Sequence, residues 1–329
     1  MQTSISRHGR RLVISTCAVA ALAGAAAPAQ AAPVLSDLRV EAGGVVLTDS
    51  RVPTDTQSFT TDTGRPTCGG SGQVKTLTGP TALGLLGSGS TVDADLRPLR
   101  ISDKFSFGLL VCGVGAFPST DSGFWLYKVN HMAPEVGGDA FKLTGGEQVL
   151  WFFQDNDRRR NTGDELVVEA PARARPGEVE VTVSSYAFNG ARKPAAGARV
   201  FFGDTAVVTD ANGKARTRLS QSTSVRAGRG GDIPSAPARV CVADDLDDCP
   251  PVRGRRIYGS AGADRLAGTP GDDVVRAGAG NDTIDVRGGN ADRVRCGRGT
   301  RDRVRTNGRD RVTTDCEFVN GRRRAPARG

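Results

Sequence analysis

The chain has 329 residues, of which 38% are hydrophobic and 24% charged, and its net charge is +8. This length is too great for one small core and suits two or three domains. Apart from an apolar run near the N-terminus, no stretch is long enough to cross a bilayer, which argues against a protein with several membrane-spanning helices.

The first 31 residues have the features of a secretory signal peptide. Several arginines precede an apolar run from Leu12 to about Ala27, and Ala29-Gln-Ala31 follows as an A-x-A cleavage site. We therefore expect residues 1–31 to be removed. The mature protein is expected to be extracellular, with association to the cell surface as a further expectation.

Export makes the cysteines informative. An even number of cysteines in an oxidising compartment favours disulfides. A zinc site is the rival interpretation, but the sequence has no C-x-x-C pair and almost no histidine. The six cysteines of the mature chain fall into three sequence-local pairs, predicted to be Cys68–Cys112, Cys241–Cys249 and Cys296–Cys316.

Residues 34–165 form the first predicted domain, made of short strands and one short helix. The segment Thr81–Leu86 predicts the helix, because its apolar residues cluster rather than alternate. Alternation along GFWLYKVN places Trp125 on a buried face, and Trp151 is likewise expected in the core. The predicted strands lie at Asp37–Val40, Val45–Leu47, Phe124–Val129 and Gln148–Phe153, with a turn at Asn130-His131.

The run W-x-Y-x-V-N…L-x-x-G-[DE]-x-V-L-W/F-F, preceded by a cysteine and the helical ALGLL, resembles the transcobalamin-like C-terminal domain family of secreted bacterial proteins. In the vitamin carriers that name the family, the related β-domain covers one side of bound cobalamin. The resemblance implies a β-domain with one short helix. The chain departs from the usual pattern at His131, where Gly commonly follows Asn.

Residues 166–242 form the second predicted domain. Val179, Val181 and Val183 alternate cleanly in GEVEVTVSSY, which predicts a half-buried strand. Asp210-Ala-Asn-Gly213 predicts a hairpin turn, with Asn212 and Gly213 supplying positive φ. The string P-A-A-G-A-x-V…T-D-A-N-G-x-A resembles bacterial immunoglobulin-like or carboxypeptidase-regulatory-like domains, which implies a β-sandwich that acts as a spacer or an adhesive stalk.

Residues 243–256 are predicted to be a linker. The four aspartates of VADDLDDCPP lack the D-x-D-x-D-G spacing of a calcium loop, so we interpret them as a solvated turn.

An Asp, any residue and then an aliphatic residue recur through residues 257–320. The first three intervals, GSAGADRLA, GTPGDDVVR and AGAGNDTID, have the nine-residue period of the G-G-x-G-x-D-x-U-x calcium-binding β-roll, and so resemble RTX (hemolysin-type) repeats. Glycine lets the loop backbone adopt positive φ, while carboxylates and loop carbonyls supply the oxygens that calcium prefers. The aliphatic residues are expected to stack into a thin core.

Loops on one edge of a roll are two repeats apart, so Asp264 is expected to share a site with Asp282, and Asp273 with Asp292. After Asp282 the intervals change and arginine replaces glycine, so no calcium is expected beyond Asp302. The outward arginines of the later repeats would neutralise the aspartates there. The alternative is a metal-free β-solenoid held by Asp–Arg pairs.

The positive charge of the mature chain lies at its end. From Pro251 onward there are 18 arginines and no lysine against 10 acidic residues. Residues 321–329 are predicted to be a basic disordered tail. Such a region suits anionic polymers of a cell surface, whereas nucleic acid is not expected; the alternative is a solvated face of Asp–Arg pairs.

These features predict an all-β or mainly β multidomain protein: a transcobalamin-like domain, an Ig-like sandwich and a degenerate parallel β-roll. Its expected function is non-enzymatic binding or adhesion, with calcium as the ion. His131 is the one histidine after residue 31, and neither G-x-S-x-G nor H-E-x-x-H occurs, so no enzyme is expected. The alternatives are an extracellular carrier of a cobalamin-like molecule and a hydrolase with an unrecognised site.

Overall fold

The computed structural model describes residues 33–64, 68–155, 163–249, 254–269, 271–287 and 291–324. The predicted signal peptide lies outside these residues. The described chain is mainly β, with one α-helix and several sheets, which confirms the predicted fold class.

The first segment contains β1 (Val34–Ala42), β2 (Val45–Thr54), β3 (Gln57–Thr60), β4 (Val74–Leu77), α1 (Ala82–Val92), the 3-10 helix η1 (Ala94–Leu96), β5 (Leu99–Phe105), β6 (Gly108–Val114), β7 (Phe117–Pro118), β8 (Gly123–Val129) and β9 (Gln148–Asp155). In the largest sheet, β2, β1, β9 and β8 are consecutive neighbours. β1 pairs antiparallel with β2 and parallel with β9. All four predicted strands are present, each longer than predicted.

Helix α1 extends well beyond the predicted Thr81–Leu86. Thr81 caps it, because its side-chain hydroxyl accepts a hydrogen bond from the amide of Gly84 at 2.9 Å. The extra turns contain glycine and serine, which have low helix propensity. They are retained because the helix packs so closely: a Cβ on Gly87 would lie 2.6 Å from Phe59, and one on Gly89 would lie 2.3 Å from Leu38. Close packing overrides local propensity here.

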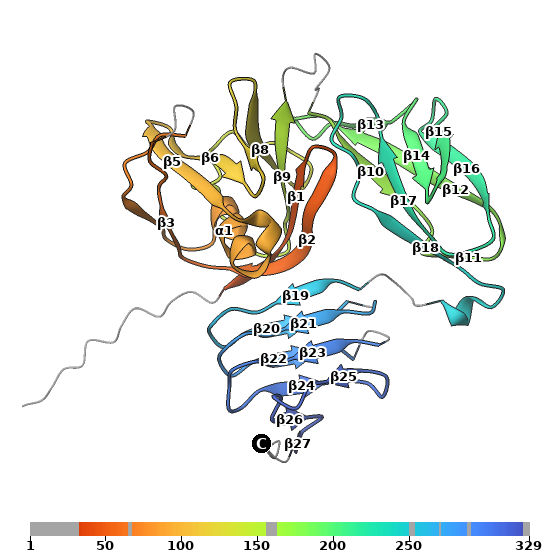
Figure 1. The fold of residues 1–329 in the computed structure, drawn as a ribbon. Coiled ribbons are helices and arrows are strands. Elements are labelled where there is room, and N and C mark those ends of the chain that lie inside the picture. The colour runs from red at the N-terminus through yellow and green to blue at the C-terminus, as the bar shows by residue number, and fades with distance from the viewer. Residues whose placement is uncertain are drawn as a thin grey trace, which may run out of the picture. The chain divides into compact units, whose positions relative to one another are not determined.

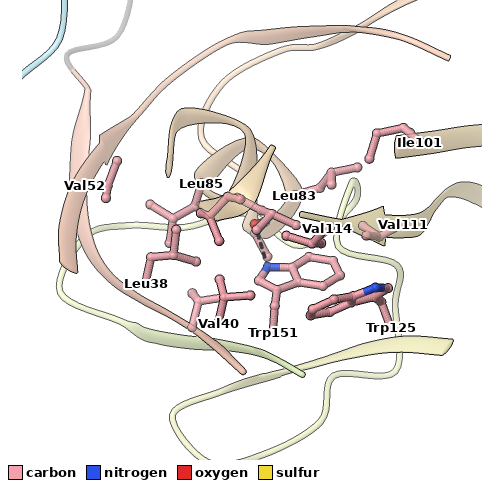
Figure 2. Packing of buried hydrophobic residues seen from close by; sticks show 14 of the residues in the cluster. Leu38, Val40, Val52, Leu83, Leu85, Ile101, Val111, Val114, Trp125 and Trp151 are labelled. Atoms are coloured by element: carbon pink, nitrogen blue, oxygen red, sulfur yellow. Dashed lines mark hydrogen bonds between the residues drawn. The ribbon is translucent and has the colours of Figure 1, made fainter. Parts of the chain in front are cut away.

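Both tryptophans of the first segment lie in its core, as predicted (Figure 2). Trp125 is 3% exposed and Trp151 is 4% exposed. Trp151 donates its indole N–H to the carbonyl of Ala82 at 3.3 Å, which ties β9 to the start of α1. The core role of these rings therefore needs no ligand.

The second segment contains β10 (Glu165–Glu169), β11 (Arg173–Ala174), β12 (Gly177–Tyr186), β13 (Arg192–Pro194), β14 (Arg199–Phe202), β15 (Thr205–Val208), β16 (Lys214–Leu219), β17 (Thr223–Gly228), β18 (Ala238–Val242) and the 3-10 helix η2 (Leu246–Asp248). β12 pairs with β10, β13 and β16 in one sheet, and β11, β18, β17, β14 and β15 form another. Residues of both sheets share one apolar core, which includes the predicted Val179, Val181 and Val183. Membership of the Ig-like class stays a prediction.

The turn at Asp210–Gly213 differs from the prediction. The amide of Gly213 bonds to the Asp210 carbonyl at 3.0 Å and its φ is +75°, so a tight turn forms, but Asn212 is not among the residues with positive φ. β15 pairs with β14, whereas β16 pairs with β12. The turn therefore carries the chain from one sheet to the other instead of closing a hairpin.

The last segment is a parallel two-sheet roll (Figure 1). Its short strands are β19 (Arg256–Tyr258), β20 (Arg265–Ala267), β21 (Val274–Arg276), β22 (Thr283–Asp285), β23 (Arg293–Arg295), β24 (Arg303–Arg305), β25 (Arg311–Val312), β26 (Phe318–Val319) and β27 (Arg322–Arg323). Successive strands alternate between the sheets, so each pairs with the strand two repeats later. The central aliphatic side chains point inward and form one core, as predicted.

The end of the roll is more ordered than the predicted tail. Arg322 and Arg323 form β27, which pairs antiparallel with β26. Residues 325–329 lie outside the described residues. All three predicted cysteine pairs are at disulfide separations, with Cα–Cα distances of 5.5, 5.7 and 5.2 Å in chain order.

Candidate metal centre

The repeated aspartates form two columns, one along each edge of the roll. Asp264, Asp282 and Asp302 precede the strands of one sheet, and Asp273, Asp292 and Asp310 precede those of the other. The amide of Asp264 donates to Asp282 Oδ1 at 2.8 Å, and the amide of Asp282 donates to Asp302 Oδ1 at 2.7 Å. On the second edge the amide of Asp273 donates to Asp292 Oδ1 at 2.7 Å. The structure thus places together the residue pairs that the sequence predicted.

Three of the carboxylates are satisfied by a hydroxyl residue four positions earlier. The amide of Ser260 donates to Asp264 Oδ2 at 2.6 Å, and the amide of Thr269 donates to Asp273 Oδ2 at the same distance. Thr306 Oγ1 donates to Asp310 Oδ2 at 2.5 Å. We call these three the capped carboxylates; the chain itself supplies the donors they need.

The other three have one oxygen without a partner. Asp282 Oδ2, Asp292 Oδ2 and Asp302 Oδ2 are buried and form no hydrogen bond within the described part of the chain. None has Ser or Thr four positions earlier. We call these the open carboxylates. A buried acceptor without a donor is costly, so each open oxygen marks a place where a bound cation would stabilise the fold.

Burial also affects the charge of the open carboxylates. It raises the pKa of Asp282 to about 6, and the like charges of Asp264 and Asp302 act in the same direction. It raises the pKa of Asp292 to about 6 as well. In each case a hydrogen bond from a backbone amide opposes the rise without cancelling it. Near neutral pH, a cation bound beside either carboxylate would therefore stabilise its ionised form.

The loops before Asp282 and Asp302 both contain a G-x-G sequence. Gly278 and Gly280 have φ of +103° and +110°, values that favour glycine. A Cβ on Gly278 would lie 2.1 Å from the Ser260 carbonyl oxygen, and one on Gly299 would lie 2.2 Å from the Gly280 carbonyl oxygen. Consecutive loops of this edge therefore stack with backbone carbonyls in close contact, and only glycine permits it.

A metal here would depend on those carbonyls. In the described ranges, no three His, Cys, Asp or Glu side chains are placed to hold a metal ion together. Calcium prefers six to eight oxygens and readily takes backbone carbonyls beside carboxylates. Two carboxylates from successive loops and the stacked G-x-G carbonyls are a donor set of this kind, so the residues present fit calcium.

The arginines of the roll point away from the aspartate columns, as predicted, but they do not neutralise them. The strand arginines are exposed, whereas Asp264, Asp273, Asp282, Asp292 and Asp302 are at most 6% exposed. Among the described residues, none of these five aspartates forms an ion pair with an arginine. Backbone amides and hydroxyls donate to these aspartates instead, while Asp285 of the roll does pair with an arginine, Arg287.

Two features of the site were missed from sequence. Asp302 was not among the predicted metal-binding residues, yet it has an open carboxylate, and its own amide donates to Glu317 Oε2 at 2.9 Å. The capping role of Ser260, Thr269 and Thr306 was also missed. The signal was present, because a hydroxyl residue stands four positions before each capped aspartate.

Comparison with known families agrees with this assignment for part of the roll. Residues 258–291 match the RTX calcium-binding nonapeptide repeat, in four copies. This match confirms the resemblance to RTX repeats and supports calcium as the bound ion.

Comparison with single proteins gives less. No curated protein matches the chain significantly. A solved structure, the crystal structure of haptocorrin in complex with Cbi, matches with a TM-score of 0.27 and 10% identity, over 37% of this chain and 25% of that one. The chain therefore spans about a quarter of the haptocorrin structure that it matches. No helix among the described residues is long and apolar enough for a membrane span.

His131 is held by structural contacts. Its ring stacks on Tyr186 with centroids 4.3 Å apart, and its Nδ1 lies 3.0 Å from Glu165 Oε2. Asn130 and His131 have φ of +48° and +70°, so the predicted tight turn is present. Neighbouring Lys128 is fully buried and donates to the Tyr186 carbonyl at 2.9 Å. Alternation along the strand did not predict this, because it placed Lys128 on the face opposite the core.

Proposed function

We propose that this chain is a secreted, non-enzymatic binding protein of the cell surface or matrix, whose C-terminal roll takes up calcium. The observation that carries the calcium proposal is the set of open carboxylate oxygens, which are buried and have no partner among the described residues. Asp282 lies within the RTX match at residues 258–291, and Asp292 and Asp302 follow it directly in the roll. Extracellular calcium would neutralise these charges and rigidify the roll.

The first calcium position belongs to the edge that holds Asp282 and Asp302. Both residues have an open oxygen, and both follow a G-x-G loop. A second, poorer position involves Asp292 with Asp273. It is poorer because Thr269 already donates a hydrogen bond to Asp273. This assignment moves the best position one turn along from the predicted Asp264–Asp282 pair. In both places calcium would neutralise the carboxylates, and the carboxylate and loop carbonyl oxygens would coordinate it.

Thermal melting of the full chain with calcium, with magnesium and with EDTA tests this proposal. Calcium is expected to raise the Tm, and magnesium to raise it less, because magnesium demands a stricter octahedral geometry. A Tm that is the same in calcium and in EDTA would refute calcium binding.

Secretion is supported by the cysteines. All six cysteines outside residues 1–31 lie in pairs at disulfide separation, and such bonds persist in oxidising compartments. The non-enzymatic role rests on the sequence, in which neither G-x-S-x-G nor H-E-x-x-H occurs. Turnover of generic ester, peptide or glycoside substrates by the purified protein, lost in His131→Ala, would instead establish the hydrolase alternative.

The carrier alternative has one structural feature in its favour. A cavity of about 690 Å³ is lined by Phe117, Phe152, Phe153 and Phe201, with Glu41 among the polar residues. Titration with cobalamin, followed through its visible absorption bands, tests this alternative. A band shift that saturates at one ligand per chain would support it, and an unchanged spectrum would remove it.

A further inference from the structure

On one outer face of the roll all the charged residues are basic. The strands β19, β21, β23 and β25 form one parallel sheet, and none of them contains an acidic residue. Their exposed arginines, which we call the arginine face, are Arg256, Arg276, Arg293, Arg295 and Arg311. Within the described residues, none of these five forms an ion pair.

Four of these arginines lie side by side in two pairs, whereas Arg256 lies opposite Val274. Arg276 pairs in register with Arg295, and Arg293 with Arg311. Neighbouring strands are about 4.8 Å apart, and like charges directly opposite each other across strands are destabilising. The outer face of the other sheet differs, because Asp285 lies on it and pairs with Arg287 at 2.6 Å. The arginine face therefore carries positive charges that no anion of the described chain balances.

We propose that the arginine face binds a linear phosphodiester polymer without bases, a polyol phosphate chain, lying across its strands. The proposal deepens the surface association proposed above and does not depend on the calcium position. Guanidinium groups bind phosphate oxygens through two parallel hydrogen bonds, which a phosphodiester offers at each repeat. A flexible chain with few bonds between phosphates can place one phosphate beside each pair of stacked arginines.

The face is less suited to other polyanions. Proteins that bind single-stranded nucleic acid without sequence preference use aromatic rings on which the bases stack. The face offers Tyr258, which is only 7% exposed and lies under Arg276 at 6.0 Å. A membrane surface would need an apolar anchor beside the charges. The large apolar side chains that are exposed in the described chain all lie outside the roll.

The test measures binding of fluorescent poly(glycerol phosphate) to the full chain by anisotropy, at low and moderate salt. The face variant carries Arg276→Gln, Arg293→Gln, Arg295→Gln and Arg311→Gln. The matched control carries four exposed arginines of the second segment changed in the same way: Arg175→Gln, Arg199→Gln, Arg218→Gln and Arg239→Gln. Both variants lose the same net charge.

We expect the face variant to bind at least about tenfold more weakly. For this variant, the slope of log K against log salt should decrease in magnitude by about 3, because each of the four lost contacts contributes about 0.7. The control should stay within about twofold of the unchanged protein. Equal losses in both variants, or no binding by the unchanged protein, would overturn the proposal. Equally tight, face-dependent binding of single-stranded DNA would overturn the choice of a base-free polymer.

The two proposals fail separately in this design. Each protein is also melted with calcium and with EDTA, and polymer binding is repeated in EDTA to remove calcium bridges. A calcium-induced rise in Tm without polymer binding would refute the arginine face alone. Polymer binding in EDTA, by a protein whose Tm is the same with calcium and with EDTA, would refute the calcium position alone.

Discussion

At the scale of single residues, the six repeated aspartates divide by what precedes them. A hydroxyl residue four positions earlier supplies donors to Asp264, Asp273 and Asp310, whereas Asp282, Asp292 and Asp302 each keep an oxygen without a partner. Aspartates at the same position of successive repeats therefore differ in chemistry. The capped carboxylates stabilise the metal-free fold, and the open carboxylates would be stabilised by a bound cation.

Asp282→Asn is expected to have opposite effects in the two states. It removes a charge whose pKa is raised by burial and further by like-charged neighbours, so the protein in EDTA should melt at a higher temperature. It also removes a charged calcium ligand, so the calcium Kd measured by calorimetry should rise at least about tenfold. An unchanged Kd would contradict the assignment of Asp282 to the site.

Asp264→Asn is the matched comparison. This carboxylate accepts from both the amide and the hydroxyl of Ser260. Burial raises the pKa of Asp264 too, but the hydrogen bonds from Ser260 oppose the rise and would be weakened by the change. Asp264→Asn should therefore melt in EDTA at a lower temperature than Asp282→Asn. The calcium Kd should change less than in Asp282→Asn.

The open carboxylates also predict the pH dependence of stability. In the metal-free protein the pKa of Asp282 and of Asp292 is about 6, above the ordinary value of 3.8. Folding raises these values, so the folded state binds more protons; this stabilisation is full below about pH 4 and is lost as pH rises through 6. The Tm in EDTA should therefore fall between pH 5 and pH 7.5.

Calcium should abolish that fall, because the ion neutralises the same carboxylates. Melting curves at pH 5, 6 and 7.5, with calcium or with EDTA, measure both trends. A Tm in EDTA that stays level or rises over this interval would contradict the raised pKa values.

At the scale of elements, the stacked loops depend on glycine. Gly280→Ala places a Cβ 2.4 Å from the Gly262 carbonyl oxygen, at a φ of +110°. We expect a loss of about 2 kcal/mol or more in the free energy of unfolding, together with weaker calcium binding. Gly262→Ala is the control, because its Cβ would have no neighbour closer than 3.7 Å. Denaturant unfolding of both variants measures the difference; similar losses would show that the loops are not in close contact.

The sequence predicted the roll better than any other element. Its period places every inward aliphatic residue and pairs each Asp with the one two repeats later, because both follow from counting. Helix α1 was predicted too short, because the fit of Gly87 against Phe59 and of Gly89 against Leu38 is decided by segments distant in the chain. The path of the chain at Gly213 was missed for the same kind of reason: local turn chemistry fixes a bend but not the sheet that the next strand joins. The buried position of Lys128 depends on carbonyls of a different segment.

At the scale of the whole molecule, the roll is continuous with a sheet of the first segment. Ile257 of β19 pairs in parallel with Arg51 of β2, and Tyr258 belongs to the apolar core of the first segment. Leu35 of β1 packs against the core of the roll. A loss of stability in the roll should therefore also destabilise β2.

Hydrogen exchange of the full chain tests this coupling. Removing calcium with EDTA should speed exchange of the β2 amides near Arg51 as well as those of β19. The amides of β12 and β16, which pair with each other in a separate sheet, serve as the internal control and should be unaffected. Faster exchange confined to the roll would show that the first segment is independent of it.

The alternation of strands between two sheets limits how such a roll changes length during evolution. One added repeat would move every later strand to the opposite sheet and would exchange the basic face for the other one. Two added repeats complete a turn and leave all later residues on their original sides. At the far end of the roll, the antiparallel hairpin of β26 and β27 interrupts the parallel order of one of the two sheets, which disfavours parallel addition of another molecule to that sheet. Growth is thus expected inside the roll, in steps of about eighteen residues, twice the nine-residue period.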